Sequence, residues 1–479
     1  MTKSALSVMT AAASVLSLLC AAPVMAAPGA DLPVEQQAAL LRDTALKTNV
    51  AYDFVAELTT RFGPRPAGSA SEKAAALWSV DKLKALGFQN VHMETFPLYV
   101  WSRGAENISV TAPFPQPLVG TSLGASTGGT VEAEAVMFDT YQLFLDSKAD
   151  LKGKIVVILQ PMAQASNGSG YGRMSGSVRR KGPMVAQERG AVGYVIRSLS
   201  TDHNRFAHAG AMTWTDNKGI PSMAISVPDA EQLGRIKAMQ VAGTAGPLRL
   251  KMTSSGQFSG LGTSQNVVAD VTGSEHPEEI IVVGGHLDSW DLGTGAIDDG
   301  AGLAITMGAA KAIIDQGVRP KRTIRVVFWG SEEVSQPADG GTTETGGGAY
   351  RETHKSEMVH HIAAAESDFG AGRINNFSLS PTTDTAFVTK LGNLLYPLGI
   401  YYDASATPHG GEDSGAMNAL VPAFDLNQDG YDYFDTHHTA NDTLDRIVPA
   451  DLNQNVAAWA TTLWMMANTD VRFSVPKAQ

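Results

Sequence analysis

The chain has 479 residues, a formal net charge of -12 at pH 7, and a hydrophobic content of 43%. This length allows one to three domains with a sizeable core. The acidic balance argues against a nucleic-acid partner.

The first 26 residues are typical of a signal peptide. Lys3 supplies positive charge, residues 11–22 are apolar, and Val24-Met25-Ala26 resembles a cleavage site. The apolar stretch is too short to favour a membrane span, so we expect export to the periplasm or the medium without a membrane anchor. Because the single cysteine, Cys20, lies inside this segment, the mature chain would contain no disulfide and no thiolate metal ligand.

The next part of the chain is predicted to be helical. Residues 33–61 have the apolar spacing of a helix, which Gly63-Pro64-Arg65-Pro66 ends. Ser71 fits the N-cap of a second helix that runs to Leu86. A strand is predicted at 91–101.

Residues 113–263 differ from the rest of the chain in their sequence pattern. Gly-rich strands alternate with short helices there, which predicts a compact α/β or β-rich module. No cluster of histidines and acids at ligand spacing occurs in this region. We therefore interpret His203 and His208 as isolated surface residues without a role in a site.

The last part of the chain alternates between predicted strands and helices. The strands span 280–285, 323–329 and 361–365, and the helices span 301–317 and 450–468. Alternation of this kind predicts an α/β fold with a mainly parallel sheet and helices on both faces.

Polar side chains gather where these predicted strands end. The strand ends, the turn after the first strand and the tail together supply His286, Asp288, Asp298, Glu332, Glu333, Asp368, His437 and His438. Taken singly, each motif also fits a surface turn or the acidic start of a helix. Together they favour a site, because open α/β sheets place their sites at the carboxyl ends of strands. Imidazoles and carboxylates without a thiolate suit a catalytic pair of divalent cations.

These motifs resemble those of the co-catalytic zinc peptidases of family M28. The matching stretches are His286-Leu-Asp288-Ser, Asp298-Asp299-Gly300, Glu332-Glu333, Glu366-Ser-Asp368 and His438-Thr-x-x-Asp442-Thr. Within the family, the pair His437-His438 is similar to the carboxypeptidase Q branch. The resemblance implies a zinc-exopeptidase fold, with a signal peptide at 1–26, a peptidase domain at 27–112 and 264–479, and an inserted protease-associated domain at 113–263.

The resemblance also implies a role for each site residue and two Zn²⁺ per chain. Asp298 would bridge the metals, His286 and Asp368 would complete one metal site, and Glu333 and His438 would complete the other. Glu332 would be the general base, and Asp288 would orient His286. His437 would either donate to the developing oxyanion or support the ligands from behind.

The sequence leaves the reaction partly open. A carboxypeptidase or dipeptidase, an aminopeptidase, a single-zinc acyltransferase similar to glutaminyl cyclases and a non-catalytic binding protein all remain as alternatives. The complete ligand set with Glu332 favours hydrolysis of a peptide or dipeptide. Residues 334–345 look longer than the turn of the family and leave specificity open. The native metal and a possible homodimer are likewise undecided by the sequence.

Overall fold

The structure is a computed structural model that describes residues 31–337 and 345–475. The predicted signal peptide, with Cys20, and residues 338–344 of the 334–345 segment lie outside the described ranges. Within those ranges, no helix has both the length and the apolar character needed to cross a membrane.

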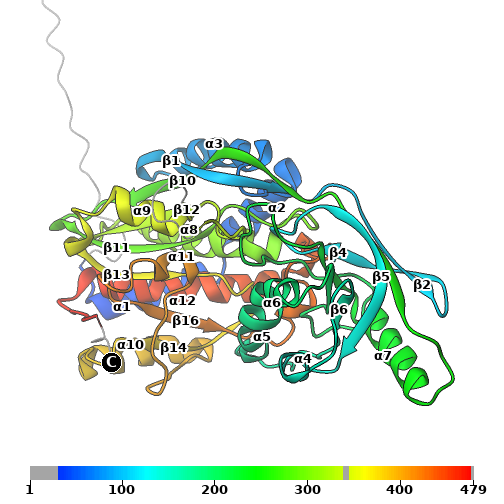
Figure 1. The fold of residues 1–479 in the computed structure, drawn as a ribbon. Helices are drawn as coiled ribbons and strands as arrows, with labels where there is room; N and C mark the ends of the chain where they lie inside the picture. The colour runs from blue at the N-terminus through cyan, green and yellow to red at the C-terminus, as the bar shows by residue number, and fades with distance from the viewer. Residues whose placement is uncertain (1–30, 338–344, 476–479) are drawn as a thin grey trace, which may run out of the picture.

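A five-stranded mixed sheet forms the centre of the main lobe (Figure 1). Its strands, in spatial order, are β1 (Gln89–Ser102), β10 (Gln257–Val271), β12 (Arg322–Trp329), β11 (His276–His286) and β13 (His361–Glu366). The neighbours β12, β11 and β13 run parallel, whereas β10 is antiparallel to both β1 and β12. The predicted parallel arrangement therefore holds for the three strands that carry predicted site residues.

Helices cover both faces of this sheet, as predicted. One face packs Ile281, Val283 and Phe328 into the large core, and the other face packs Val282 and Val327 into a smaller one. The helices on the first face are α1 (Val34–Ala45), α2 (Val50–Phe62), α3 (Ala70–Ala85), α8 (Ala301–Asp315) and α12 (Pro449–Asn468). On the other face lie α9 (Gly346–Thr353) and α11 (Glu412–Gly415). Burial on both faces explains why the parallel strands are almost continuously apolar.

Two local predictions about the first helices were wrong. The helix predicted at 33–61 is broken between α1 and α2, where the hydroxyl of Thr48 accepts a hydrogen bond from the amide of Val50 at 3.2 Å. Ser69 rather than Ser71 caps α3, since its hydroxyl accepts from the amide of Glu72 at 3.1 Å. Short polar side chains compete for the backbone at such positions, which periodicity alone does not resolve.

A second lobe, the insert, is built on an eight-stranded sheet. Its strands, in spatial order, are β3 (Gln116–Leu118), β2 (Glu106–Ala112), β9 (Arg249–Ser254), β5 (Gly129–Phe138), β6 (Ile155–Ile158), β7 (Gly193–Arg197), β8 (Ser222–Ile225) and β4 (Gly120–Ser122). Its helices are α4 (Tyr141–Asp146), α5 (Ser169–Met174), α6 (Gly182–Glu188) and α7 (Val227–Val241). The sheet begins with β2, before the predicted boundary at residue 113, because β2 pairs with β3 and β9.

A long antiparallel ribbon joins the two lobes. β1 pairs with β10 as far as Trp101 and Ser102, and the ribbon continues into the insert as the β2–β9 pair (Figure 1). A small sheet of β15 (Tyr401–Tyr402), β14 (Ile374–Leu379) and β16 (Phe424–Gln428), with α10 (Thr385–Leu395), completes the main lobe.

Candidate metal centre

The ends of three adjacent parallel strands bring the predicted ligands together. His286 ends β11 and pairs with Trp329 of β12, while Gly284 pairs with Glu366 of β13. The residues that follow Trp329 and Glu366 therefore leave the sheet beside His286. The site lies at the carboxyl edge of the parallel strands, where open α/β sheets place their ligands.

Two triads of side chains share Asp298. His286 Nε2 lies 3.1 Å from Asp298 Oδ1 and 3.5 Å from Asp368 Oδ1. His438 Nε2 lies 3.2 Å from Asp298 Oδ2 and 3.1 Å from Glu333 Oε2. Within each triad the ligand atoms lie within 4.8 Å of one another. Each oxygen of Asp298 thus serves a different triad, which is the arrangement of a bridging carboxylate.

Asp442 fixes the segment that carries Asp298. Its carboxylate accepts hydrogen bonds from the amides of Ala296 at 2.8 Å, Ile297 at 2.6 Å and Asp298 at 3.3 Å. These amides belong to a segment about 145 residues away in the sequence. Asp442 therefore couples the tail to Asp298, the residue that both triads share.

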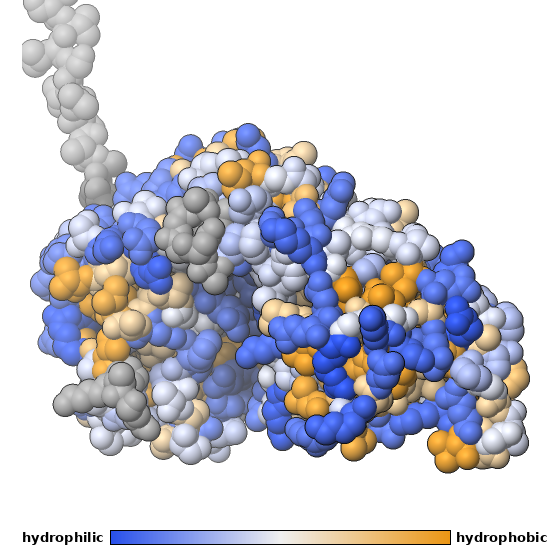
Figure 2. Space-filling view, viewed as in Figure 1, coloured by the Kyte–Doolittle hydropathy of each residue, from blue (hydrophilic) through white to orange (hydrophobic). Residues whose placement is uncertain are grey.

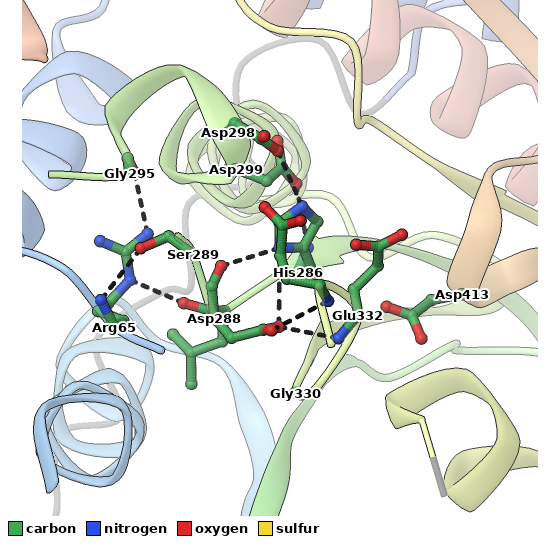
Figure 3. Close-up of polar contacts among 12 residues, drawn as sticks. Arg65, His286, Asp288, Ser289, Gly295, Asp298, Asp299, Gly330, Glu332 and Asp413 are labelled. Atoms are coloured by element: carbon green, nitrogen blue, oxygen red, sulfur yellow. Dashed lines mark hydrogen bonds and ion pairs between the residues drawn. The ribbon is translucent and has the colours of Figure 1, made fainter. Parts of the chain in front are cut away.

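Asp288 acts on its neighbours differently from the prediction. Nδ1 of His286 lies 2.9 Å from the backbone carbonyl oxygen of Asp288 and 3.7 Å from its carboxylate. The carboxylate instead accepts from the amides of Glu332 at 3.0 Å and Glu333 at 3.2 Å. Figure 3 shows this carboxylate beside the Glu332 backbone, joined to it by a dashed line. Asp288 therefore orients His286 mainly through its carbonyl and holds the Glu332–Glu333 turn with its side chain.

Arg65 and Asp299 support the site but were missed from the sequence. The side chain of Arg65, fully buried, donates to the carbonyls of Leu287 at 2.7 Å and Gly295 at 2.9 Å (Figure 3). Asp299 accepts from the amide of His286 at 3.0 Å. The only local signals were Arg65 inside a Pro-Gly turn and Asp299 beside a candidate ligand.

His208 of the insert is buried against the histidine pair, so its interpretation as a surface residue was wrong. His208 is only 1% exposed, and its Nε2 lies 2.9 Å from Nδ1 of His437. Nε2 of His437 lies 3.6 Å from Asp298 Oδ2, and its ring stacks on His438 with centroids 3.5 Å apart. His437 thus lies beside Asp298 and His438, two of the predicted ligands.

The electrostatics of the cluster favour positive charge between the carboxylates. Burial lowers the pKa of His286, but the carboxylates of Asp368 and Asp298 outweigh it and raise that pKa well above the usual value. Burial lowers the pKa of His438 to about 4, with Asp298 opposing the shift, so this imidazole is neutral near pH 7. A neutral imidazole is the form that binds a metal.

The residues fit a pair of divalent cations. Glu333 Oε1 is buried and has no hydrogen-bond partner among the described residues. Buried oxygens without partners are costly unless another ligand satisfies them. Two imidazoles and three carboxylates are the hard and borderline donors that Zn²⁺ accepts in catalytic sites.

Both lobes contribute to the cleft above this cluster. The cleft has a volume of about 310 Å³, and Tyr171 and Arg179 of the insert line it together with Glu332 and His438. A neighbouring pocket of about 740 Å³ begins at Asp368. Figure 2 shows the surface hollowed between the two lobes. A substrate in this cleft would contact the insert as well as the main lobe.

Comparisons with known proteins agree with this architecture. The family model for peptidase family M28 matches residues 266–463. Carboxypeptidase Q of Mus musculus is 31% identical over 427 residues, which are 88% of this chain and 86% of that protein. Human carboxypeptidase Q is 32% identical over 429 residues, with the same coverage.

Solved structures share the fold. The structure of a peptidase M28 precursor from Shewanella amazonensis SB2B has 41% identity and a TM-score of 0.85, covering 93% of this chain and 99% of that one. An aminopeptidase from Aneurinibacillus sp. strain AM-1 has 19% identity and a TM-score of 0.60, covering 93% and 98%. At that identity the likeness concerns the fold alone. The identity to carboxypeptidase Q over most of both chains, together with the matching family model, shows that this chain belongs to peptidase family M28 and is a metallopeptidase.

Proposed function

We propose that the chain is an exported di-zinc exopeptidase that hydrolyses dipeptides or short peptides. The observation that carries the proposal is the pair of triads that share Asp298, because a bridging carboxylate with two sets of end ligands suits two cations. The relatives that are named carboxypeptidases favour exopeptidase action. The signal-like first 26 residues support export.

The five predicted ligands, Glu332 and Asp288 each have a role in this proposal. His286, Asp298 and Asp368 would hold one Zn²⁺, and Asp298, Glu333 and His438 the other. When bound, such a pair would polarise a peptide carbonyl and would make a water molecule more acidic. Glu332 takes the proton of the attacking water and passes it to the leaving amine. Asp288 keeps the Glu332 backbone in place through the bond at 3.0 Å.

Glu332 is suited to proton transfer. Burial raises its pKa well above the usual value, His286 opposes this shift, and the negative charge of Asp368 adds to it. A carboxylate that binds a proton more readily than usual is a better general base for water. Its side chain points toward the His286–Asp298 side of the site (Figure 3).

The alternatives are less well supported. An acyltransferase that works with one zinc would not need both triads, and a binding protein would not need Glu332 beside them. An aminopeptidase with the same centre differs only in which end of the substrate it recognises.

Metal analysis and a substrate screen test the proposal. The purified mature protein should bind two Zn²⁺ per chain and hydrolyse members of a dipeptide library. Parallel screens with blocked amino or carboxyl termini separate the three exopeptidase types. One zinc per chain with cyclase activity, or full zinc binding without hydrolysis of any peptide, would contradict the proposal.

A further inference from the structure

The wall of the cleft that comes from the insert carries positive charge. Tyr171, Ser175, Arg179 and Arg180 line the same cleft as the carboxylates of the metal cluster. Both arginines belong to the π-helical segment Ser175–Lys181, which follows α5. The cleft therefore has an anionic floor in the main lobe and a cationic wall in the insert.

Arg179 is a buried cation without an anionic partner among the described residues. It is 2% exposed, its Nε donates to the carbonyl of Ala211 at 3.1 Å, and its Nη1 donates to the hydroxyl of Tyr171. Both partners are neutral, and a guanidinium has further N–H donors. A buried charge is costly unless it is paired, so an anion that enters the cleft would remove a cost that the protein alone bears.

The imidazole ring of His438 lies between the guanidinium of Arg179 and the predicted metal site. A Cβ on Gly210 would lie 2.1 Å from Arg179 Nη1 and 2.8 Å from His438 Nδ1, so these two nitrogens flank the same glycine. The other nitrogen of that ring, Nε2, faces Asp298 and Glu333. Gly210 permits this close approach, because any side chain at this position would displace Arg179 from the ring.

Arg180 stands at the mouth of the cleft. Its side chain is exposed, and Nη1 lies 3.3 Å from the hydroxyl of Ser335, two residues beyond Glu333. It therefore reaches from the insert across to the segment that carries the predicted base and ligand. An arginine in this position can bind a carboxylate with two parallel hydrogen bonds.

We propose that Arg179 and Arg180 bind the free C-terminal carboxylate of the substrate. The inference rests on the proposed exopeptidase function and makes the substrate class more specific: peptides with one residue after the scissile bond. Arg179 and Arg180 line the same cleft as Glu332, Glu333 and Asp368, and neighbouring residues of a chain are only about 3.8 Å apart between Cα atoms. A carboxylate one residue beyond the scissile bond would therefore lie in the cleft that both arginines line.

In an alternative, purely structural role, Arg179 only holds the backbone of Ala211 and the side chain of Tyr171 in place through its two hydrogen bonds. Arg180 separates the two roles, since its only described side-chain bond is the one to Ser335 at the surface. Lys181 provides a matched control, because it is also exposed, carries the same charge and is not part of the cleft lining.

The test uses the full mature protein with Zn²⁺ and a dipeptide library in two forms, free acid and C-terminal amide. The measured quantity is the ratio of kcat/KM for each free acid to that for its amide. We expect wild type to prefer the free acids, and Arg180→Gln and Arg179→Lys to lower the ratio on the order of 10–100-fold, as for the loss of a charge-assisted hydrogen bond. Lys181→Gln should leave the ratio unchanged.

Each remaining outcome has a defined meaning. A wild-type ratio near one, or an unchanged ratio in Arg180→Gln, would overturn the carboxylate site while the exopeptidase function stands. An equal loss for acids and amides in Arg179→Lys, with Arg180→Gln unaffected, would assign Arg179 to the structural role and overturn the proposal. Hydrolysis of neither form by zinc-loaded wild type would reject the proposed function, and the carboxylate site with it.

Discussion

Nε2 of His208 in the insert lies 2.9 Å from Nδ1 of His437, across 229 residues of sequence. The contact fixes the plane of the His437 ring, which presents its other nitrogen to Asp298. The insert thus reaches the predicted metal cluster through a hydrogen bond between two imidazoles. His208 therefore acts on the cluster indirectly, by positioning His437.

Replacing His208 should lower turnover without emptying the metal site. His208→Ala should reduce kcat by about 10–100-fold, the usual effect of losing an outer-shell partner. His208→Gln, which keeps a polar group near the Nε2 position, should restore part of it. Zinc content at saturation and kcat are measured together, with exposed His203→Ala as control. Loss of one zinc in His208→Ala would make His208 a ligand rather than a positioning residue.

Glu332→Gln should bind both metals and lose on the order of 10²–10⁴-fold in kcat, because the amide has the same shape but cannot accept the proton. Metal analysis and steady-state kinetics decide this. Glu412→Gln serves as the control, because Glu412 is exposed and lines the same cleft. Activity near wild type, or zinc loss before activity loss, would reject the assigned base.

The histidine pair should divide into one ligand and one supporting residue. His438 Nε2 contacts both Asp298 and Glu333, so His438→Ala should bind about one zinc fewer at saturating zinc. His437→Ala should keep both metals and show a lower kcat, since its nearest ligand oxygen is 3.6 Å away. Anomalous-scattering maps of the two variants check this. A missing metal peak in His437→Ala alone would exchange the two assignments.

Glu72 should make the fold less stable as the pH rises. Burial raises its pKa from 4.5 to about 8, and the charge of Asp288 adds to this, although Ser264 and the amide of Gly68 donate hydrogen bonds to its carboxylate. Between these two values the folded state keeps a proton that the unfolded state has released. The free energy of unfolding therefore falls with rising pH in this window, by up to ~1.4 kcal/mol per pH unit.

Glu72→Gln should remove this dependence. Relative to wild type, the variant should gain free energy of unfolding steadily from about pH 4.5 to about pH 8, and no further above that. Urea denaturation at a series of pH values measures it, and Glu188→Gln on the surface controls for the loss of one carboxyl group. A constant difference across the series would mean that Glu72 is ionised in the folded protein.

The sequence was sufficient for the features that depend on short stretches of chain. Apolar runs predicted β11, β12 and β13, and the polar residues directly after them predicted that a cluster of side chains gathers there, because parallel strands end at a common edge.

Other features depend on contacts between distant segments and have no local signal. His208 stands in an ordinary loop sequence, and only the docking of the insert on the main lobe brings it to His437. Arg65 likewise finds its carbonyl partners more than two hundred residues away. Burial of such polar groups follows from tertiary packing, which periodicity and composition do not encode.

The ribbon of β1 and β10 has a consequence for protein engineering. A hydrogen-bonded strand pair that runs through both lobes holds the insert as a fixed wall rather than as a tethered, exchangeable domain. A shortened chain that keeps every predicted ligand but ends the ribbon early would lack one side of its cleft. Grafting the insert of another family member would likewise succeed only if it brings its own counterparts of His208 and Arg179 into register.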